Sequence, residues 1–277
     1  MSSVISDKHF HDERAAYAYV EARIWPTGPV CPHCGNVNPS RMKLFAGKST
    51  RLGVRQCNEC RKPFTVKIGT IFESSHIPLR IWLQAIHMIC SSKKGISGNQ
   101  LHRTLGVTLK TAWFMSHRLR EAMRPGSFAP MGGAGSTVEA DETFIGRKDE
   151  TIKRRGHGHK NAVLSLVDRN SGQVRSFHVD GTSAADILPI IKANVATETA
   201  MMTDEGGHYF TLGDHFASHE SVSHKAEEYV RGSVHTNTID GYYSVFKRGM
   251  KGVYQHCSER HLHRYLSEFD FRYSKSH

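Results

Sequence analysis

The 277-residue sequence predicts a multidomain α+β protein. This length is sufficient for two or three small domains. Apolar residues recur at helical spacing before residue 130, whereas extended patterns dominate after it. The charge divides at the same place, because residues 1–130 carry 19 Lys and Arg against 7 Asp and Glu, and the remainder carries 18 against 19. Such segregation is typical of a polyanion-binding module joined to a domain of another kind.

The first half is expected to be mostly helical. Apolar spacing predicts helices over residues 8–24 and from Leu79 to Ile89, and a third helix beginning near Ser97. Thr108 can cap a fourth helix. The inward side of that helix would carry Ala112, Met115, Leu119 and Met123. The Pro- and Gly-rich residues 124–136 are expected to form a linker.

Four cysteines between the first two helices have the spacing of a metal site. Cys31 and Cys34 form one C-x2-C knuckle and Cys57 and Cys60 another. We expect four thiolates around one structural zinc ion, in preference to a redox dithiol, a disulfide or an iron site. No apolar run is long enough to span a bilayer and no signal peptide is evident, so a reducing cytoplasm is the expected setting. Cys90 and Cys257 are expected to be ordinary thiols.

Residues 97–123 have the length and punctuation of a helix-turn-helix, with "LGV" as the turn. Residues of the second helix that point away from its inward side are candidates for contact with DNA. These are Lys110, Thr111, Phe114, His117 and Arg118. The alternative is a plain helical hairpin.

The second half changes to strand patterns. Strands are expected over 137–146, 162–168 and 173–180, the last two joined by the turn "RNSG". A helix over 183–196 follows, and then a strand over 199–206 that ends at an acid. After an irregular or helical segment we expect a strand over 228–236 and a final helix that begins in "TNTIDGYYSVFKRGMKG".

Three carboxylates could converge on one pocket. Alternation along the first strand puts Glu139, Asp141 and Thr143 on one face. Asp204 ends a later strand, and Asp240 lies on the last helix, where Lys247 returns to nearly the same face. Such oxygen ligands suit divalent cations and two-metal phosphodiester chemistry. The alternative, without a functional role, is a set of solvated surface charges.

The histidines do not favour a second metal site. His157 and His159 lie between glycines and cations in a predicted hairpin loop, where phosphate contact or simple exposure is expected.

Together these motifs resemble the small zinc-ribbon insertion-sequence transposases of the DDE class. The resemblance covers nearly the whole chain through "VEADETFIGRK", "MTDEG" and the block "HTNTIDGYYSVFKRGMKGVYQHCSERHLHRYLSEFDFRY". It implies a ribonuclease-H-like catalytic domain in which Asp141, Asp204 and Asp240 hold catalytic magnesium. Asp240 stands where the family usually has glutamate, and Lys247 matches its basic residue. Asn237 is a backup ligand, and Glu142 and Glu205 rank lower because strand neighbours point to opposite faces.

The resemblance also implies the organisation and partners of the protein. The expected domains are an N-terminal helix at 1–26, a zinc ribbon at 27–72, a helix-turn-helix region at 73–126 and the catalytic domain at 135–277. The expected partners are double-stranded terminal repeats and target DNA, contacted in the catalytic domain by Lys247 and Arg248, with a homo-oligomer in the synaptic complex. The expected setting is the bacterial cytoplasm, at the nucleoid, with no membrane partner. The alternatives are a DNA-binding protein with an inactive nuclease-like domain and a structure-selective nuclease.

Overall fold

The computed structural model describes residues 3–47, 49–125, 129–149, 151–153, 155–223, 226, 228 and 230–275. The chain divides into two compact units. Unit 1 consists of residues 1–92 and 98–119, and unit 2 consists of residues 93–97 and 120–277. In the described part of the chain, no helix combines the length and apolar character needed to cross a bilayer.

Unit 1 begins with a short helical turn and a helix, where the sequence predicted one continuous helix over 8–24. A 3-10 turn covers Lys8–Phe10, and helix α1 covers Glu13–Ile24. Asp12 interrupts the run because its carboxylate accepts the backbone N–H of Ala15 at 2.8 Å and so caps α1. Side-chain capping therefore overrides the apolar spacing that continues through Phe10.

The cysteine-bearing segment forms a small antiparallel sheet in the order β1-β2-β3. Its strands are β1 (Met42–Leu44), β2 (Arg55–Cys57) and β3 (Pro63–Phe64). The buried cluster of this part consists of Cys31, Met42, Cys57 and Phe64. So small an apolar cluster supplies little stabilisation by itself, which is the situation in which small domains rely on a metal.

Three helices complete unit 1: α2 (Leu79–Ser91), α3 (Gly98–Leu105) and α4 (Leu109–Ala122), whose last three residues belong to unit 2. All three confirm predicted helices. Thr108 caps α4 as expected, since its hydroxyl oxygen accepts the N–H of Thr111 at 3.1 Å. The predicted inward residues Ala112, Met115 and Leu119 are buried.

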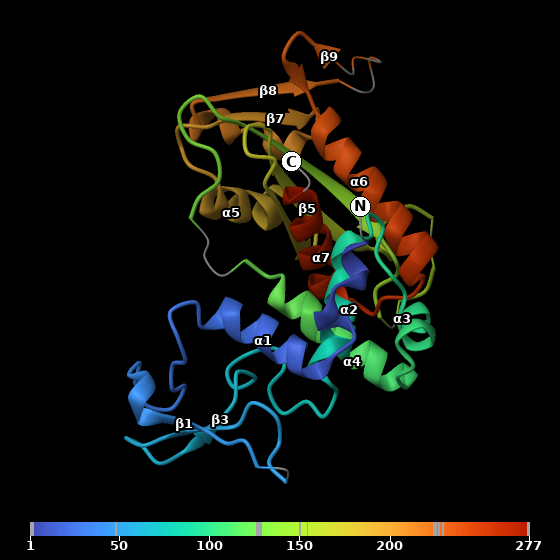
Figure 1. Cartoon of the computed structure of the whole chain (residues 1–277). Coiled ribbons are helices and arrows are strands. Elements are labelled where there is room, and N and C mark those ends of the chain that lie inside the picture. Colours follow the sequence, from blue (N-terminus) through green and yellow to red (C-terminus); the bar gives the residue numbers. More distant parts are fainter. Residues whose placement is uncertain are drawn as a thin grey trace. The chain divides into compact units, whose positions relative to one another are not determined.

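Unit 2 is built on a five-stranded mixed sheet in the order β6-β5-β4-β7-β8 (Figure 1). Its strands are β4 (Thr137–Ile145), β5 (Asn161–Asp168), β6 (Val174–Val179), β7 (Ala200–Asp204) and β8 (Ser218–Val222). β4 pairs antiparallel with β5 and parallel with β7. β4 is therefore the central strand of the sheet, and it carries Asp141.

The predicted strands β4, β5, β6 and β7 and the predicted helix over 183–196 are confirmed, the last as α5 (Ala184–Asn194). The expectation of an irregular or helical segment at 218–222 is wrong, because β8 pairs in parallel with β7 there. β8 is an edge strand with mostly polar, half-exposed side chains, so it lacks the apolar signal of a buried parallel strand.

Two further expectations need correction. The single strand predicted over 228–236 is a tight hairpin of β9 (Val230–Arg231) and β10 (Val234–His235), and residue 229 lies outside the described residues. Of the predicted linker over 124–136, residues 126–128 also lie outside the described residues. Its Met131 is buried and forms a parallel bridge with Val195.

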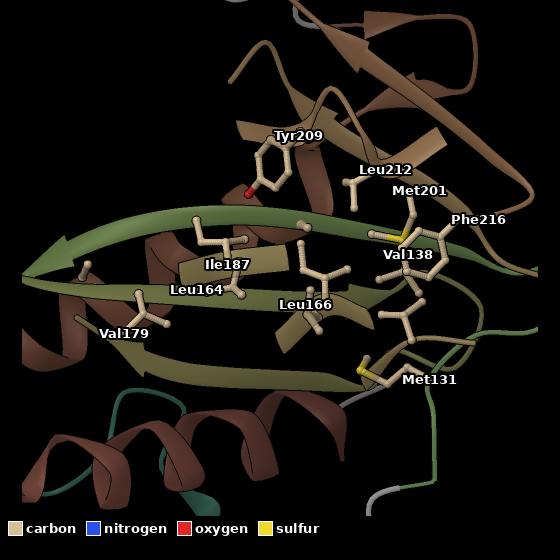
Figure 2. Close-up of a cluster of buried hydrophobic side chains, with 14 residues drawn as sticks. Met131, Val138, Leu164, Leu166, Val179, Ile187, Met201, Tyr209, Leu212 and Phe216 are labelled. Atoms are coloured by element: carbon tan, nitrogen blue, oxygen red, sulfur yellow. The ribbon is translucent and has the colours of Figure 1, made fainter. Parts of the chain in front are cut away.

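Helices cover both faces of the unit 2 sheet. On one face, α5 contributes Ile187 and Ile191 to a buried cluster with Val138, Ala140 and Leu164 (Figure 2). On the other face lie α6 (Asn237–Gly249), its continuation as a π-helix over Met250–Tyr254, and α7 (Leu262–Ser274). Strand alternation therefore sends Val138 and Ala140 toward α5, and Glu139 and Asp141 toward α6.

A buried ion pair within unit 2 joins Arg120 to α7. Glu268 of α7 is fully buried and accepts a hydrogen bond from Arg120 Nε at 2.6 Å. The other oxygen of Glu268 accepts the Tyr254 hydroxyl at 2.5 Å and lies 2.9 Å from Arg272 Nη2. One carboxylate thus neutralises two guanidinium groups where water has little access.

We predict that Glu268→Gln lowers the free energy of unfolding by about 3–5 kcal/mol, because removing one partner leaves a buried charge uncompensated. Chemical denaturation of the full chain measures it. The matched control is Glu59→Gln, which breaks the exposed Glu59–Arg41 pair and should cause no measurable change. Equal stabilities of the two variants would contradict a structural role for the buried pair.

Candidate functional site

The four cysteines of unit 1 converge on one point. Cys31 Sγ lies 3.7 Å from Cys60 Sγ, and Cys34 Sγ lies 3.7 Å from Cys57 Sγ. All four sulfurs lie within 4.8 Å of one another. Sulfurs placed tetrahedrally at about 2.3 Å from a zinc ion would be about 3.8 Å apart. The sulfur geometry therefore matches a closed four-thiolate zinc site.

Backbone turns and hydrogen bonds prepare this site. Gly35 adopts a φ of 72°, which a glycine reaches without strain, and its N–H bonds back to the Cys31 carbonyl at 2.9 Å. The backbone N–H of Cys60, and with it the amide of Asn36, lowers the pKa of the Cys57 thiol to about 6. The backbone N–H of Asn36 also lowers the pKa of Cys34, but desolvation and the neighbouring thiols outweigh it and raise that pKa. The site therefore favours one thiolate at Cys57 before metal binds.

The outward side of α4 carries only some of the predicted DNA contacts. Lys110 and Phe114 are exposed and Thr111 is partly exposed. The expectation for His117 is wrong, since its ring is 5% exposed and lies 4.1 Å from the Trp113 ring. In the same unit Arg118 donates to the carbonyls of Ile71 at 2.9 Å and Glu73 at 2.7 Å, so its guanidinium is already engaged.

Asp141 and Asp204 lie on adjacent parallel strands. The β4–β7 ladder ends with Glu139 opposite Met202, so each aspartate lies two residues beyond the last pair. Two residues preserve the face of a strand, and both aspartates therefore lie on the face opposite α5. Asp204 is held by the N–H of Gly206, which donates to its carboxylate at 2.9 Å.

The surroundings of Asp141 are crowded with negative charge. Burial raises the pKa of Asp141 to about 8, and the charges of Glu142, Asp204 and Asp240 add to the rise. Asp240, from α6, is therefore close enough to Asp141 to repel its charge. Two strands and one helix thus bring the three predicted acids into one electrostatic neighbourhood.

Helix α6 also brings Lys247 to this neighbourhood. Tyr243 lies one turn before Lys247, and the Lys247 ammonium is 5.5 Å from the Tyr243 ring centre. The Tyr243 hydroxyl donates to the backbone carbonyl of Asp141 at 2.5 Å. The predicted cation is therefore linked to the central strand through one aromatic ring, whereas Arg248 is exposed on the neighbouring side of α6.

The three carboxylates do not form a closed ligand set. Among the described residues, the four cysteines are the only group of three or more candidate ligands whose atoms all lie within 4.8 Å. Asp240 is exposed, and its carboxylate lies 3.4 Å from the Thr236 hydroxyl. A glutamate at this position would reach about one methylene further. The arrangement brings the acids into one neighbourhood without closing them into a ligand cluster.

The competing acids have other partners. The carboxylate of Glu142 accepts a hydrogen bond from the Tyr209 hydroxyl and lies 3.2 Å from His208 Nε2, both on the segment that follows β7. Glu205 accepts a hydrogen bond from the Ser223 hydroxyl. Asn237, one helical turn before Asp240, is exposed at the start of α6. It remains an available oxygen ligand.

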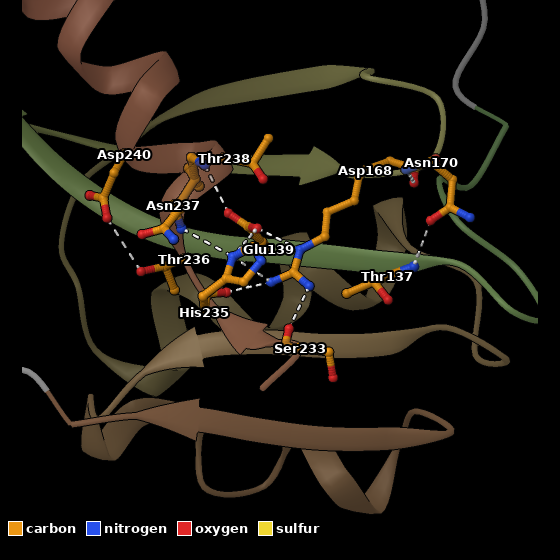
Figure 3. A network of polar contacts seen from close by, with 12 residues as sticks. Thr137, Glu139, Asp168, Asn170, Ser233, His235, Thr236, Asn237, Thr238 and Asp240 are labelled. Carbon is orange, nitrogen blue, oxygen red and sulfur yellow. Dashed lines mark hydrogen bonds and ion pairs between the residues drawn. The ribbon is translucent and has the colours of Figure 1, made fainter. Parts of the chain in front are cut away.

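A polar network beside the acids was missed by sequence reasoning (Figure 3). The carboxylate of Glu139 is fully buried, accepts Arg169 Nε at 2.6 Å and accepts the backbone N–H of Ile239 at 2.8 Å. Strand alternation placed Glu139 on the Asp141 face, which was a signal for burial. Its partner Arg169 lies in the turn after β5, and no pattern in the sequence indicated that pairing.

One of the two loop histidines differs from the expectation of exposure. His157 is exposed, with its ring stacked 4.5 Å from the Phe144 ring. His159 was expected in an exposed loop, but it is only 8% exposed.

Comparisons with known proteins agree with this division of the chain. Residues 132–274 match the family described as "ISXO2-like transposase domain", and residues 11–63 match "Transposase zinc-ribbon domain". A protein of Halobacterium salinarum, named "Uncharacterized protein in transposable element ISH50", is 27% identical over 281 residues. That similarity covers 96% of this chain and 92% of the relative.

We predict that the purified chain carries about one zinc ion and that Cys57→Ser loses it, because three thiolates cannot close the tetrahedron. Elemental analysis measures the metal content, and loss of zinc should lower the melting temperature of unit 1. Cys90→Ser, outside the four-sulfur cluster, is the control and should keep its zinc. Unchanged zinc content in Cys57→Ser would contradict the assigned site.

Proposed function

This chain belongs to the transposase family that carries the ISXO2-like domain, and we propose that it cuts the ends of an insertion sequence and joins them to target DNA. The observation that carries the proposal is the convergence of Asp141, Asp204 and Asp240 from β4, β7 and α6. Lys247 beside this group would receive a DNA phosphate. The proposed reaction is cleavage at each end followed by attack of the freed 3′-hydroxyl on target DNA.

Magnesium fits the donors at this site. All three candidate ligands offer carboxylate oxygens, which suit a hard cation, and their charges repel one another without a cation. We propose that Asp141 and Asp204 hold the cations and that Asp240 completes the set. When bound, two cations would activate the attacking oxygen and stabilise the leaving one. The chain itself positions the ligands and keeps Asp141 partly buried.

We further infer a ribonuclease-H-like fold for unit 2. The support is the order β6-β5-β4-β7-β8, with three antiparallel strands followed by two parallel ones and helices on both faces. This arrangement places the first acid on the central strand. It places the second at the end of the adjacent strand, as the proposed chemistry requires.

For unit 1 we propose DNA binding through α3, the turn and α4 as a helix-turn-helix. The support is the basic charge of this half and the exposure of Lys110, with Thr111 beside it. His117 and Arg118 are not part of this proposal because their side chains are buried or engaged. The proposed partners are terminal repeats and target DNA at the nucleoid, with a homo-oligomer in the synaptic complex.

A second candidate function is DNA binding without cleavage. The observation that favours it is the open carboxylate set, since among the described residues the three acids do not form a cluster of ligand atoms within 4.8 Å. A structure-selective nuclease would share the metal site but would not join ends. The products formed from DNA that carries the terminal repeats flanking the gene for this protein distinguish all three functions.

We predict that Asp141→Asn or Asp204→Asn lowers cleavage on the order of 10³-fold, since metal ions supply several kcal/mol of transition-state stabilisation. Cleavage is measured with Mg²⁺ on DNA carrying the terminal repeats. DNA affinity, measured by gel shift, should stay near that of the parent. Asp214→Asn, an exposed acid in the same unit, is the control. Parent-level cleavage by either variant would overturn the assignment.

The third ligand is tested separately. We predict that Asp240→Ala is inactive and that Asp240→Glu cleaves at least as fast as the parent, because the longer side chain restores the reach of the glutamate that the family usually has. Rates at saturating Mg²⁺ measure both. If Asp240→Ala keeps normal cleavage while Asn237→Ala loses it, the third ligand is the Asn237 amide. That result would assign Asp240 to a charged helix face.

A further inference from the structure

We propose that Glu139 and Arg169 form a clasp that sets the position of Asp240 relative to Asp141. The clasp consists of these two side chains and the residues they hold, Ser233, His235 and Ile239 (Figure 3). Both are positioning residues and neither is assigned as a metal ligand. The inference rests on the proposed function, because it concerns the geometry of that metal site.

Glu139 joins the two elements that carry the acids. It lies two residues before Asp141 on β4, on the same face and about 7 Å along the strand. One of its oxygens accepts the N–H of Ile239, the residue immediately before Asp240, at 2.8 Å. A carboxylate at this position also stabilises the N-terminal end of α6 through the helix dipole. The first turn of α6 is therefore tied directly to the central strand.

Arg169 holds the segment that leads into α6. Its Nε donates to the second oxygen of Glu139 at 2.6 Å, and its Nη1 donates to the Ser233 carbonyl at 2.8 Å. Its Nη2 donates to the His235 carbonyl at 2.5 Å. The backbone N–H of Arg169 donates to the Thr137 carbonyl at 3.0 Å, so the clasp is anchored to β4 at both ends. A lysine ammonium has no planar fork with which to reproduce this set.

His235 also takes part in the clasp. Its Nδ1 lies 3.0 Å from Arg169 Nη2 and 3.4 Å from the backbone N–H of Asn237, and both of these groups are donors. Nδ1 is therefore placed to accept from both groups. The same atom lies 3.4 Å from the carboxylate of Glu139.

Only a carboxylate can accept both of the hydrogen bonds made at position 139. The two donors that face it, Arg169 Nε and the Ile239 N–H, need an acceptor on each side. A glutamine offers one oxygen and one NH₂ group, so one of the two donors would meet another donor. Glu139→Gln therefore loosens α6 from β4 while keeping the volume of the side chain. The position of Asp240 should become less well fixed.

The test compares Glu139→Gln and Arg169→Lys with the parent, using the full chain. Mn²⁺ binding without DNA is followed by electron paramagnetic resonance, and cleavage is measured over a range of Mg²⁺ concentrations. We expect both variants to need about tenfold more metal for half-saturation, as seen when residues that orient metal ligands are changed. Cleavage should recover at high Mg²⁺. Hydrogen exchange of the Ile239 amide should accelerate in Glu139→Gln.

The control is Glu268→Gln, which breaks a buried ion pair of unit 2 outside the clasp. All variants are assayed at a temperature where circular dichroism shows them folded. Loss of stability alone would leave the metal requirement of the folded protein unchanged in every variant. If Glu139→Gln and Arg169→Lys keep the parent half-saturation for Mn²⁺ and Mg²⁺, the clasp is overturned. Failure of the parent itself to bind Mn²⁺ or cleave would instead overturn the proposed function.

Discussion

The buried carboxylate of Glu139 is the contact on which the arrangement of unit 2 depends. It binds the central strand to the first turn of α6 and neutralises the arginine that holds the chain entering that helix. A buried carboxylate is costly unless it is paired and fully hydrogen-bonded, and both oxygens of Glu139 have donors. These hydrogen bonds offset the cost of burial. They also fix β4 to α6, whose contacting residues are 100 positions apart in sequence. The acids on those elements can therefore share one neighbourhood.

The same arrangement brings like charges together, so the acids repel one another. Asp141 is partly buried beside three other carboxylates, and its raised pKa reports how unfavourable its charge is there. Apolar packing on both faces of the sheet and the clasp hold this arrangement in place. Energy stored as repulsion in the folded protein would be released when divalent cations bind, which couples the fold to the proposed chemistry.

Much of this molecule was predictable, for local physical reasons. Knuckle spacing identified Cys31, Cys34, Cys57 and Cys60, and alternation along β4 placed Asp141 on the face that meets α6. The edge strand β8 was not predicted because its mostly polar residues show no apolar periodicity. The burial of His117 and the hydrogen bonds of Arg118 were not predicted because both depend on tertiary partners. The role of Arg169 was not predicted for the same reason, since its acceptors Glu139, Ser233 and His235 lie 30, 64 and 66 residues away.

The most direct test of the account is to locate the bound metal within the chain. Fe²⁺ placed in the Mg²⁺ site, with ascorbate and peroxide, cuts the backbone near the ion, and mass spectrometry identifies the fragments. Cuts near Asp141, Asp204 and Asp240 together, suppressed by excess Mg²⁺, are the result that the account predicts. Cuts confined to the segments around Glu142 and His208, with none in the first turn of α6, would contradict it.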